Sequence, residues 1–219
     1  MKINKIFQLI FESNLNIKKA AEIGVYSFAS SSIKPLIERG ITCDLFEAIP
    51  DYSKKIAADI ANFPNAEVHN LAVSNYSGDI TFFLAGPSTF DSSQMESPAI
   101  NHDNFDKNIA EKVTVQCVDF SQIDTGDYDF ISIDVEGGEY RILERMKSRP
   151  KLINLETQSR DYINPKLGSI TDWMIENNYT IWFRNNTDTI FIKKPRVSIG
   201  IQLNLNAWWH NKKFFGGRL

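Results

Sequence analysis

Four carboxylates stand where short apolar segments of the sequence end: Glu22, Glu47, Asp134 and Glu156. In open α/β sheets, ligands bind outside the carboxyl ends of the strands, near the point where the strand order reverses. One acidic strand end would mean little, because such ends are exposed and tolerate charge. Four of them in one chain of 219 residues favour an active site.

The spacing between the first glycine turn and the second of these carboxylates indicates a nucleoside cofactor. Glu47 follows Gly24 by 23 positions, and an acidic residue about 20 positions beyond such a turn commonly binds ribose hydroxyls. The turn contains one glycine, whereas a dinucleotide needs several so that backbone N–H groups can approach its pyrophosphate. Glu22 would also repel a pyrophosphate. S-adenosylmethionine has no phosphate and carries an ammonium and a sulfonium, so the acidic turn favours this cofactor over NAD.

The elements that must position these residues alternate between strand and helix. Strands are expected at residues 20–26, 41–46, 66–73, 128–133 and 151–155, and helices at 33–39, 51–62, 139–146 and 169–177. Such alternation with short connections predicts an α/β fold with a doubly wound, mostly parallel sheet. Residues 180–183 and 189–193 should close the sheet as an antiparallel pair, so that the final strand is antiparallel.

The middle of the chain interrupts this alternation. Residues 80–84 and 113–118 are expected to pair as an inserted β-hairpin, and a polar stretch from Gly86 to about Lys112 separates them. A loop of that length inside a compact domain is usually functional and often forms a lid.

The segment Asp129–Leu143 reads D-F-I-S-I-D-V-E-G-G-E-Y-R-I-L. It resembles the signature D-F-I-x-I-D-V-E-G-x-E-x-x-I-L of the FkbM-type S-adenosylmethionine-dependent methyltransferases. Supporting matches are L-F-E at 45–47 with Pro50, N-L-A-V-S at 70–74 with Gly78, S-T-F at 88–90, L-I-N-L-E at 152–156 and T-I-F-I-K-K at 189–194. The resemblance extends from about Ala21 to Lys194. It implies a Rossmann-like class I methyltransferase fold and methylation of a hydroxyl of a sugar or another natural product.

The first glycine turn departs from the family pattern D-x-G-A-N-x-G. Glu22 replaces the Asp, Tyr26 the Asn and Phe28 the second Gly, while Gly24 carries over. The resemblance also implies that residues 70–72 lie where relatives hold adenine. The candidate cofactor-binding residues are therefore Glu22, Gly24, Tyr26, Ser27, Glu47, Ala48, Asn70, Leu71, Ala72, Ser88 and Asp134. An inactive cofactor-binding scaffold is an alternative consistent with the divergent turn.

Asp134 and Glu136 are the candidate catalytic residues. Methyl transfer from a sulfonium is an in-line displacement, so alignment of the reacting atoms supplies much of the acceleration. The acceptor hydroxyl must still lose its proton, and Asp134 or Glu136 could act as a general base whose pKa is raised by nearby like charge. His102, in the polar loop, is a third candidate that loop closure would place, although a solvated loop histidine is the simpler interpretation.

A metal ion is a second explanation for the same acidic residues. Asp134, Glu136 and Glu156 offer hard oxygen ligands from neighbouring strand ends, which suit Mg²⁺. A bound cation would lower the pKa of the acceptor hydroxyl. The sequence leaves the general-base and the metal hypotheses open.

The charge of the chain is unevenly distributed. The formal net charge is −3, yet residues 193–219 contain six Lys or Arg residues and no Asp or Glu. We expect an N-terminal amphipathic helix in residues 1–19, a methyltransferase domain in 20–194 and a basic, aromatic tail in 195–219. The tail suits packing on the acidic domain or on a second protomer in a homodimer. It also suits peripheral contact with a membrane or a lipid-linked substrate.

The expected partner is a small-molecule or glycan acceptor. A lipid-linked or peptide acceptor is the alternative, and nucleic acid is disfavoured because the catalytic part lacks a basic face. Apolar runs are too short for a membrane-spanning helix and no cleavage signal follows the first helix, so a cytoplasmic location is expected. Cys43 and Cys117 are expected to be reduced, buried thiols.

Overall fold

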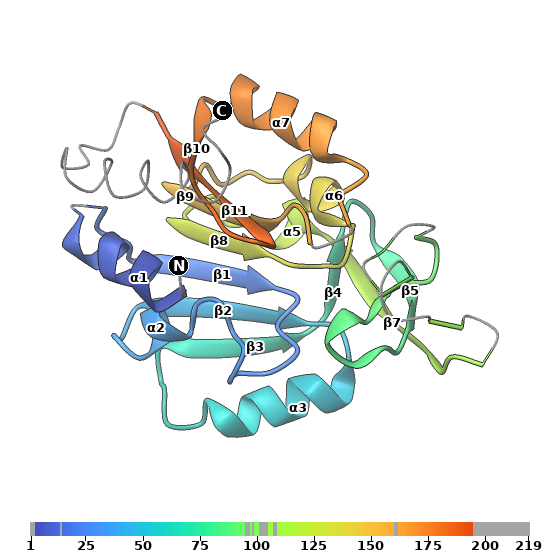
Figure 1. Cartoon of the computed structure of the whole chain (residues 1–219). Coiled ribbons are helices and arrows are strands. Elements are labelled where there is room, and N and C mark those ends of the chain that lie inside the picture. Colours follow the sequence, from blue (N-terminus) through green and yellow to red (C-terminus); the bar gives the residue numbers. More distant parts are fainter. Residues whose placement is uncertain are drawn as a thin grey trace.

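The computed structural model describes residues 3–13, 15–94, 97, 99–100, 105–106, 109–159 and 162–194 (Figure 1). His102 and the tail at 195–219 lie outside the described residues. The description that follows concerns the described part of the chain.

A seven-stranded sheet forms the centre of the molecule. Its strands are β1 (Lys19–Ile23), β2 (Thr42–Glu47), β3 (Ala66–Asn70), β8 (Phe130–Ile133), β9 (Leu152–Glu156), β10 (Tyr179–Arg184) and β11 (Asp188–Lys193). They lie in the order β10-β11-β9-β8-β1-β2-β3. All pairs from β9 to β3 are parallel, whereas β11 is antiparallel to both of its neighbours. The predicted doubly wound sheet with an antiparallel final strand is confirmed.

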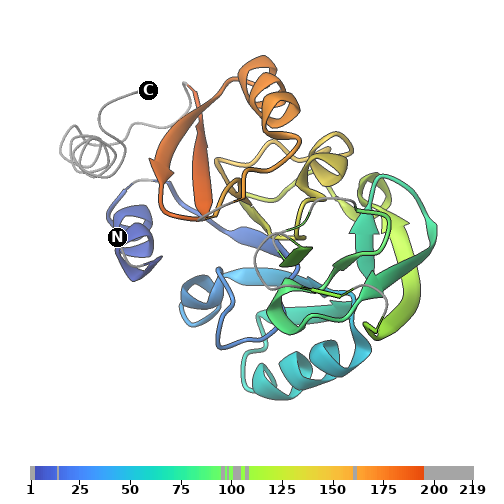
Figure 2. The same cartoon turned by 45° about the vertical axis from the view of Figure 1, so that its right-hand side comes forward.

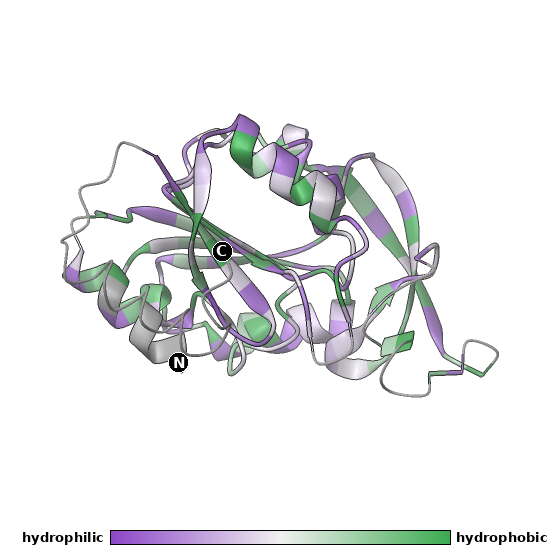
Figure 3. Ribbon diagram, turned by 45° about the horizontal axis from the view of Figure 1, so that its top comes forward, coloured by the Kyte–Doolittle hydropathy of each residue, from purple (hydrophilic) through white to green (hydrophobic). Residues whose placement is uncertain are grey.

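Helices cover both faces of this sheet (Figures 1 and 2). One face packs against α1 (Ile3–Glu12), α2 (Lys34–Ile37) and α3 (Pro50–Asp59), and the other against α5 (Phe120–Ile123), α6 (Glu139–Leu143) and α7 (Leu167–Glu176). Neighbouring strand residues enter opposite cores, as Ala20 and Ala21 do, because successive side chains of a strand point to opposite faces. The helices alternate between hydrophobic and hydrophilic bands, as expected when only one side contacts the sheet (Figure 3).

A second, four-stranded sheet stands at the carboxyl ends of the first, where the arrowheads of β1, β2 and β3 point (Figure 1). It consists of β4 (Ala72–Ser74), β5 (Gly78–Phe83), β6 (Phe90–Asp91) and β7 (Lys112–Asp119), in the order β4-β7-β5-β6. The predicted pairing of residues 80–84 with 113–118 is confirmed as the antiparallel pair β5 and β7. The insertion is larger than the predicted hairpin, because β4 and β6 join the same sheet.

The prediction of one continuous strand over residues 66–73 is wrong. The strand divides at Leu71, so that β3 belongs to the main sheet and β4 pairs with β7 in the second sheet. The Asn70 side-chain amide donates to the carbonyl oxygens of Glu47 and Ala48, at 3.0 Å each, and the Leu71 N–H donates to the Glu47 carbonyl at 3.1 Å. These bonds turn the chain from one sheet into the other.

Both cysteines, Cys43 and Cys117, are free and buried, as predicted. None of the described helices combines the length and the apolar character needed to cross a bilayer.

Candidate active site

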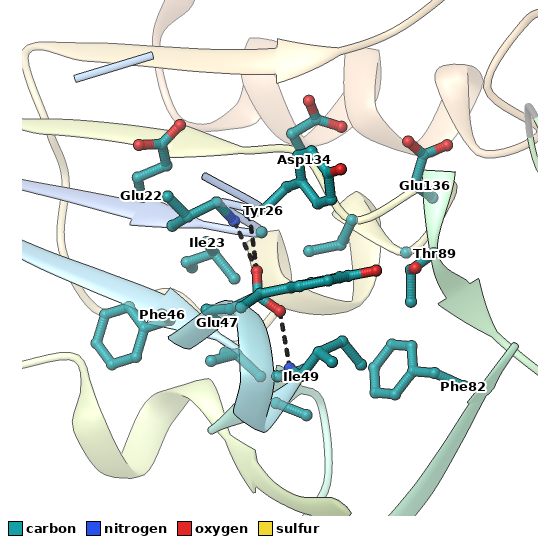
Figure 4. A pocket seen from close by; sticks show the side chains of 18 of the residues that line it. Glu22, Ile23, Tyr26, Phe46, Glu47, Ile49, Phe82, Thr89, Asp134 and Glu136 are labelled. Carbon is teal, nitrogen blue, oxygen red and sulfur yellow. Dashed lines mark hydrogen bonds between the residues drawn. The ribbon is translucent and has the colours of Figure 1, made fainter. Parts of the chain in front are cut away.

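A cavity of about 500 Å³ lies where β1, β2 and β8 end and reaches the second sheet (Figure 4). The sequence-predicted residues that line it are Glu22, Gly24, Tyr26, Ser27, Glu47, Ala48, Leu71, Ala72, Asp134 and Glu136. Three other predicted residues, Asn70, Ser88 and Glu156, are absent from the lining. Asn70 instead holds the end of β2, as described above, and Ser88 ends the short 3-10 helix η1 (Gly86–Ser88).

Gly24 brings three strand ends together. Its φ of +84° favours glycine, and a Cβ built there would lie 1.8 Å from the Asp134 carbonyl oxygen. The Gly24 N–H donates to the Phe46 carbonyl at 3.0 Å, and the Asp134 N–H donates to the Ile23 carbonyl at 2.9 Å. A side chain at this position would therefore force β1 and β8 apart at the edge of the cavity.

Glu47 fastens the glycine turn to β2. Its carboxylate accepts hydrogen bonds from the backbone N–H groups of Val25 (3.3 Å), Tyr26 (2.8 Å) and Ile49 (2.7 Å). The side chain is buried, which raises its pKa, while these hydrogen bonds lower the pKa. Oε2 already accepts two of these hydrogen bonds, whereas Oε1 accepts only the one from Ile49. Because a carboxylate oxygen can accept two hydrogen bonds, Oε1 of Glu47 can also bind a hydroxyl in the cavity.

Glu22 fastens the other end of the same turn. Its carboxylate accepts from the Ser31 hydroxyl at 2.5 Å and from the Ser32 N–H at 2.7 Å. Burial raises the pKa of Glu22 to about 7, against which these hydrogen bonds act. Tyr26, between the two carboxylates, has a φ of 57°, a left-handed conformation that Asn adopts more readily than Tyr.

Asp134, Glu136 and Glu156 form an acidic cluster in which one carboxylate oxygen from each lies within 4.8 Å of the others. Figure 4 shows Asp134 between Glu22 and Glu136. Burial raises the pKa of both Asp134 and Glu156, and repulsion from neighbouring carboxylates raises it further. The cluster therefore holds protons more strongly than isolated carboxylates do. The three residues proposed as metal ligands do lie together, although only Asp134 and Glu136 are among the residues that line the cavity.

A buried carboxylate shapes the loop that carries this cluster. Glu139 is fully buried, and its carboxylate accepts from the N–H groups of Val135 and Gly137, at 3.1 Å each, and from the Asn164 side chain at 2.6 Å. These hydrogen bonds stabilise a tight turn between β8 and α6. Glu136, inside this turn, has a left-handed backbone conformation with a φ of 57°.

Several residues that line the cavity were missed by sequence reasoning. Tyr52, on α3, packs edge-on against Tyr26, with ring centroids 4.9 Å apart. Asp91 of β6 and Arg141 of α6 form an ion pair of 2.8 Å in the wall. Of these residues, only Tyr52 could have been recognised from the local sequence, because it is an aromatic residue in the first turn of α3, directly after β2. The others depend on how the second sheet folds over the first.

Comparison with known proteins gives one sequence match and several structural similarities. The chain matches the family of the methyltransferase FkbM domain over residues 20–181. Comparison with curated proteins finds no match.

Three solved structures illustrate the structural similarity. A putative caffeoyl-CoA O-methyltransferase from Staphylococcus aureus is 18% identical, with a TM-score of 0.48 over 87% of this chain and 82% of that chain. A precorrin-6y C5,15-methyltransferase from Geobacter metallireducens GS-15 is 14% identical, with a TM-score of 0.43 over 84% and 85%. The methyltransferase domain of the bacterial protein CtHen1 is 10% identical, with a TM-score of 0.47 over 89% and 97%.

The family assignment rests on the sequence match, which covers most of the chain and includes Glu22, Glu47, Asp134, Glu136 and Glu156. Because that match extends over the whole cavity-forming part of the main sheet up to β10, the chain belongs to the methyltransferase FkbM domain family and has the class I fold of S-adenosylmethionine-dependent methyltransferases.

Proposed function

We propose that the chain transfers a methyl group from S-adenosylmethionine to a hydroxyl of a sugar or glycan precursor, such as a nucleotide-sugar or a surface polysaccharide unit. The observation that carries this proposal is a single cavity that joins the ribose-type carboxylate Glu47 to the acidic residues Asp134 and Glu136. An acceptor in that cavity can thus lie beside both the cofactor and a group that removes a proton. A lipid-linked or peptide acceptor, and an inactive cofactor-binding scaffold, are the alternatives.

The lining of the cavity fits S-adenosylmethionine. A volume of about 500 Å³ is within the usual range for small-molecule sites. Glu47 would bind the ribose hydroxyls, and the negative charge of Glu22 and Asp134 would favour the ammonium and sulfonium of the methionine end. Bound there, the cofactor supplies an electrophilic methyl group, while the chain orients the acceptor and removes its proton.

Two routes for that proton deserve comparison. In the first, a carboxylate oxygen of Asp134 or Glu136 takes the proton directly, which the raised pKa of Asp134 favours. In the second, Asp134, Glu136 and Glu156 hold Mg²⁺, which lowers the pKa of the acceptor hydroxyl. One carboxylate oxygen from each residue lies within 4.8 Å of the others, so small movements of the side chains would bring all three onto one cation.

Calorimetry with S-adenosylmethionine and S-adenosylhomocysteine tests the cofactor part of the proposal. We expect both to bind, and Glu47→Gln to weaken binding by about tenfold to a hundredfold, because one oxygen facing the N–H donors and hydroxyls becomes an amide. Glu67→Gln is the matched control, since the Glu67 side chain is 73% exposed on β3. If neither compound binds, the methyltransferase proposal fails. Binding without methyl transfer to any hydroxylated acceptor would favour the scaffold.

Chelation separates the two proton routes. If a carboxylate is the base, transfer measured as S-adenosylhomocysteine release should persist after exhaustive treatment with EDTA. If Mg²⁺ activates the hydroxyl, the treatment should abolish transfer and added Mg²⁺ should restore it.

A further inference from the structure

We propose that Arg141 and Asp91 form the acceptor subsite and that this subsite selects an uncharged sugar ring, which it binds through a hydroxyl beside the one that is methylated. The inference rests on the proposed function and specifies which class of sugar enters the cavity. It is carried by an oriented ion pair in the cavity wall and by the charge of the other lining residues.

The ion pair is held in place from the second sheet. Arg141 Nη1 donates to Asp91 Oδ2 at 2.8 Å, and the Asp91 carboxylate also accepts from the Ser93 N–H (2.8 Å) and hydroxyl (2.7 Å). The Asp91 side chain is 11% exposed and that of Arg141 is 35% exposed. Within the described part of the chain, the Nε and Nη2 groups of Arg141 have no hydrogen-bond acceptor. Donors on an oriented, partly exposed guanidinium are therefore left for a ligand.

The pair lies at the acceptor end of the cavity. Figure 4 shows Glu22 and Glu136 on opposite sides of Asp134, so Glu136 marks the end away from the glycine turn. Gln94, three residues after Asp91, approaches the same end, since a Cβ built on Gly138 would lie 3.7 Å from its Nε2 atom. Arg141 follows Gly138 by one turn of α6. A ring whose reacting hydroxyl meets Asp134 or Glu136 can therefore present a neighbouring hydroxyl to Asp91 and Arg141.

The charge of the lining decides between classes of sugar. Five carboxylates line the cavity, and Arg141 is the one cationic side chain among the described lining residues. Its charge is already balanced by Asp91, so a carboxylate or phosphate on the ring would meet net repulsion. A hydroxyl can donate to Asp91 and accept from Arg141 at the same time. The site thus suits a neutral ring, and the diphosphate of a nucleotide-sugar would have to lie outside the cavity.

Saturation-transfer NMR on the full chain, saturated with S-adenosylhomocysteine, tests the inference. The probes are the methyl glycosides of glucose, galactose and mannose and the corresponding methyl uronosides, each at millimolar concentration. We expect signal from at least one neutral glycoside and none from its uronoside. Arg141→Gln and Asp91→Asn should each weaken that binding by at least tenfold, with the affinity for S-adenosylhomocysteine changed by less than twofold.

Arg145→Gln is the matched control. Arg145 pairs with Asp119 in the same way, four residues further on, but neither residue lines the cavity. Arg141→Lys keeps the charge without the planar fork and provides a second variant if Arg141→Gln does not fold; it too should weaken binding.

Three results would overturn the inference: equal or stronger binding of uronosides, undiminished binding in folded Arg141 variants, or no glycoside binding by a chain that still binds S-adenosylhomocysteine. Failure to bind S-adenosylhomocysteine would instead overturn the proposed function, so the two failures are distinguishable.

Discussion

Single residues hold the strand ends in the arrangement that creates the cavity. Gly24 combines a left-handed backbone with close packing against the Asp134 carbonyl, and these two constraints can be separated by mutation. Gly40 has a similar φ of +77°, but nothing lies within 4 Å of its added Cβ. The two glycines therefore form a natural pair for comparison.

We expect Gly24→Ala to lower the free energy of unfolding by roughly 3 kcal/mol or more, because it combines backbone strain with overpacking. Gly40→Ala should cost only about 1 kcal/mol, the strain alone. Urea titration of both variants measures the difference. Equal losses would show that the close approach to Asp134 adds nothing to stability.

The buried carboxyl of Glu22 makes stability depend on pH. Its pKa is about 7 in the folded chain and 4.5 when free of the fold, so the folded state binds the proton more tightly. The resulting stabilisation is complete below pH 4.5 and is lost as the pH rises through 7. The unliganded protein should therefore be less stable at pH 8 than at pH 5, with Glu22 contributing on the order of 2–3 kcal/mol.

Glu22→Gln resembles the protonated carboxyl and should reduce this pH dependence without removing it, because Asp134 and Glu156 act in the same direction. Urea unfolding at the two pH values measures the change. A variant with the full pH dependence of the parent chain would exclude Glu22 as a source. Binding of a cationic cofactor should strengthen over the same pH interval, since it favours the ionised form.

At the scale of elements, periodic hydrophobicity was enough to predict most of the main sheet and its helices. The strands β8 and β9 are mostly apolar segments between polar turns, interrupted only by Ser132 in β8 and by Asn154 in β9 before the final Glu156, and such near-continuous segments identify buried parallel strands. Acidic residues at strand ends were predictable for the same reason, because the end of a strand is visible in the sequence. Glu22, Glu47 and Asp134 were thus placed in one cavity from their positions alone.

The second sheet could not be predicted in the same way. Its assembly depends on the division between β3 and β4, which is fixed by bonds from Asn70 to carbonyls more than 20 positions earlier. Nothing local distinguishes Asn70 from any other polar strand residue. Asp91 and Arg141 meet only after that sheet is folded, so their place in the site required the tertiary structure.

At the scale of the whole molecule, two arginines of the α6 segment form ion pairs with the second sheet. Arg141, in α6, pairs with Asp91 of β6, and Arg145, just after α6, pairs with Asp119 of β7, where Nη2 and Oδ2 are 2.7 Å apart. The Asp119 pKa is lowered to about 2 by this guanidinium. The segment that contains α6 is thus linked to the second sheet, which borders the cavity, by two ion pairs.

Removing both arginines should loosen the second sheet selectively. In the Arg141→Gln, Arg145→Gln double variant, we expect faster amide hydrogen exchange in β5 and β7 but unchanged exchange in β8 and β9. Arg39→Gln, which removes a cation above the Phe11 ring on the opposite face, serves as the control. Uniformly faster exchange would indicate global destabilisation and would contradict this role for the arginines.

The position of β11 has a consequence for how the chain acquires its fold during synthesis. β11 lies between β9 and β10, although it follows both in the chain. Asp188, the first residue of β11, lies opposite Glu156, the last residue of β9. Until residues up to Lys193 have left the ribosome, β9 is the unpaired edge of the sheet, and another chain can pair with it. Over the same interval β10 cannot join the sheet, because its only neighbour among the described strands is β11. The half of the sheet that carries Glu156 is therefore completed last, and chains that stop before Asp188 should be prone to aggregate.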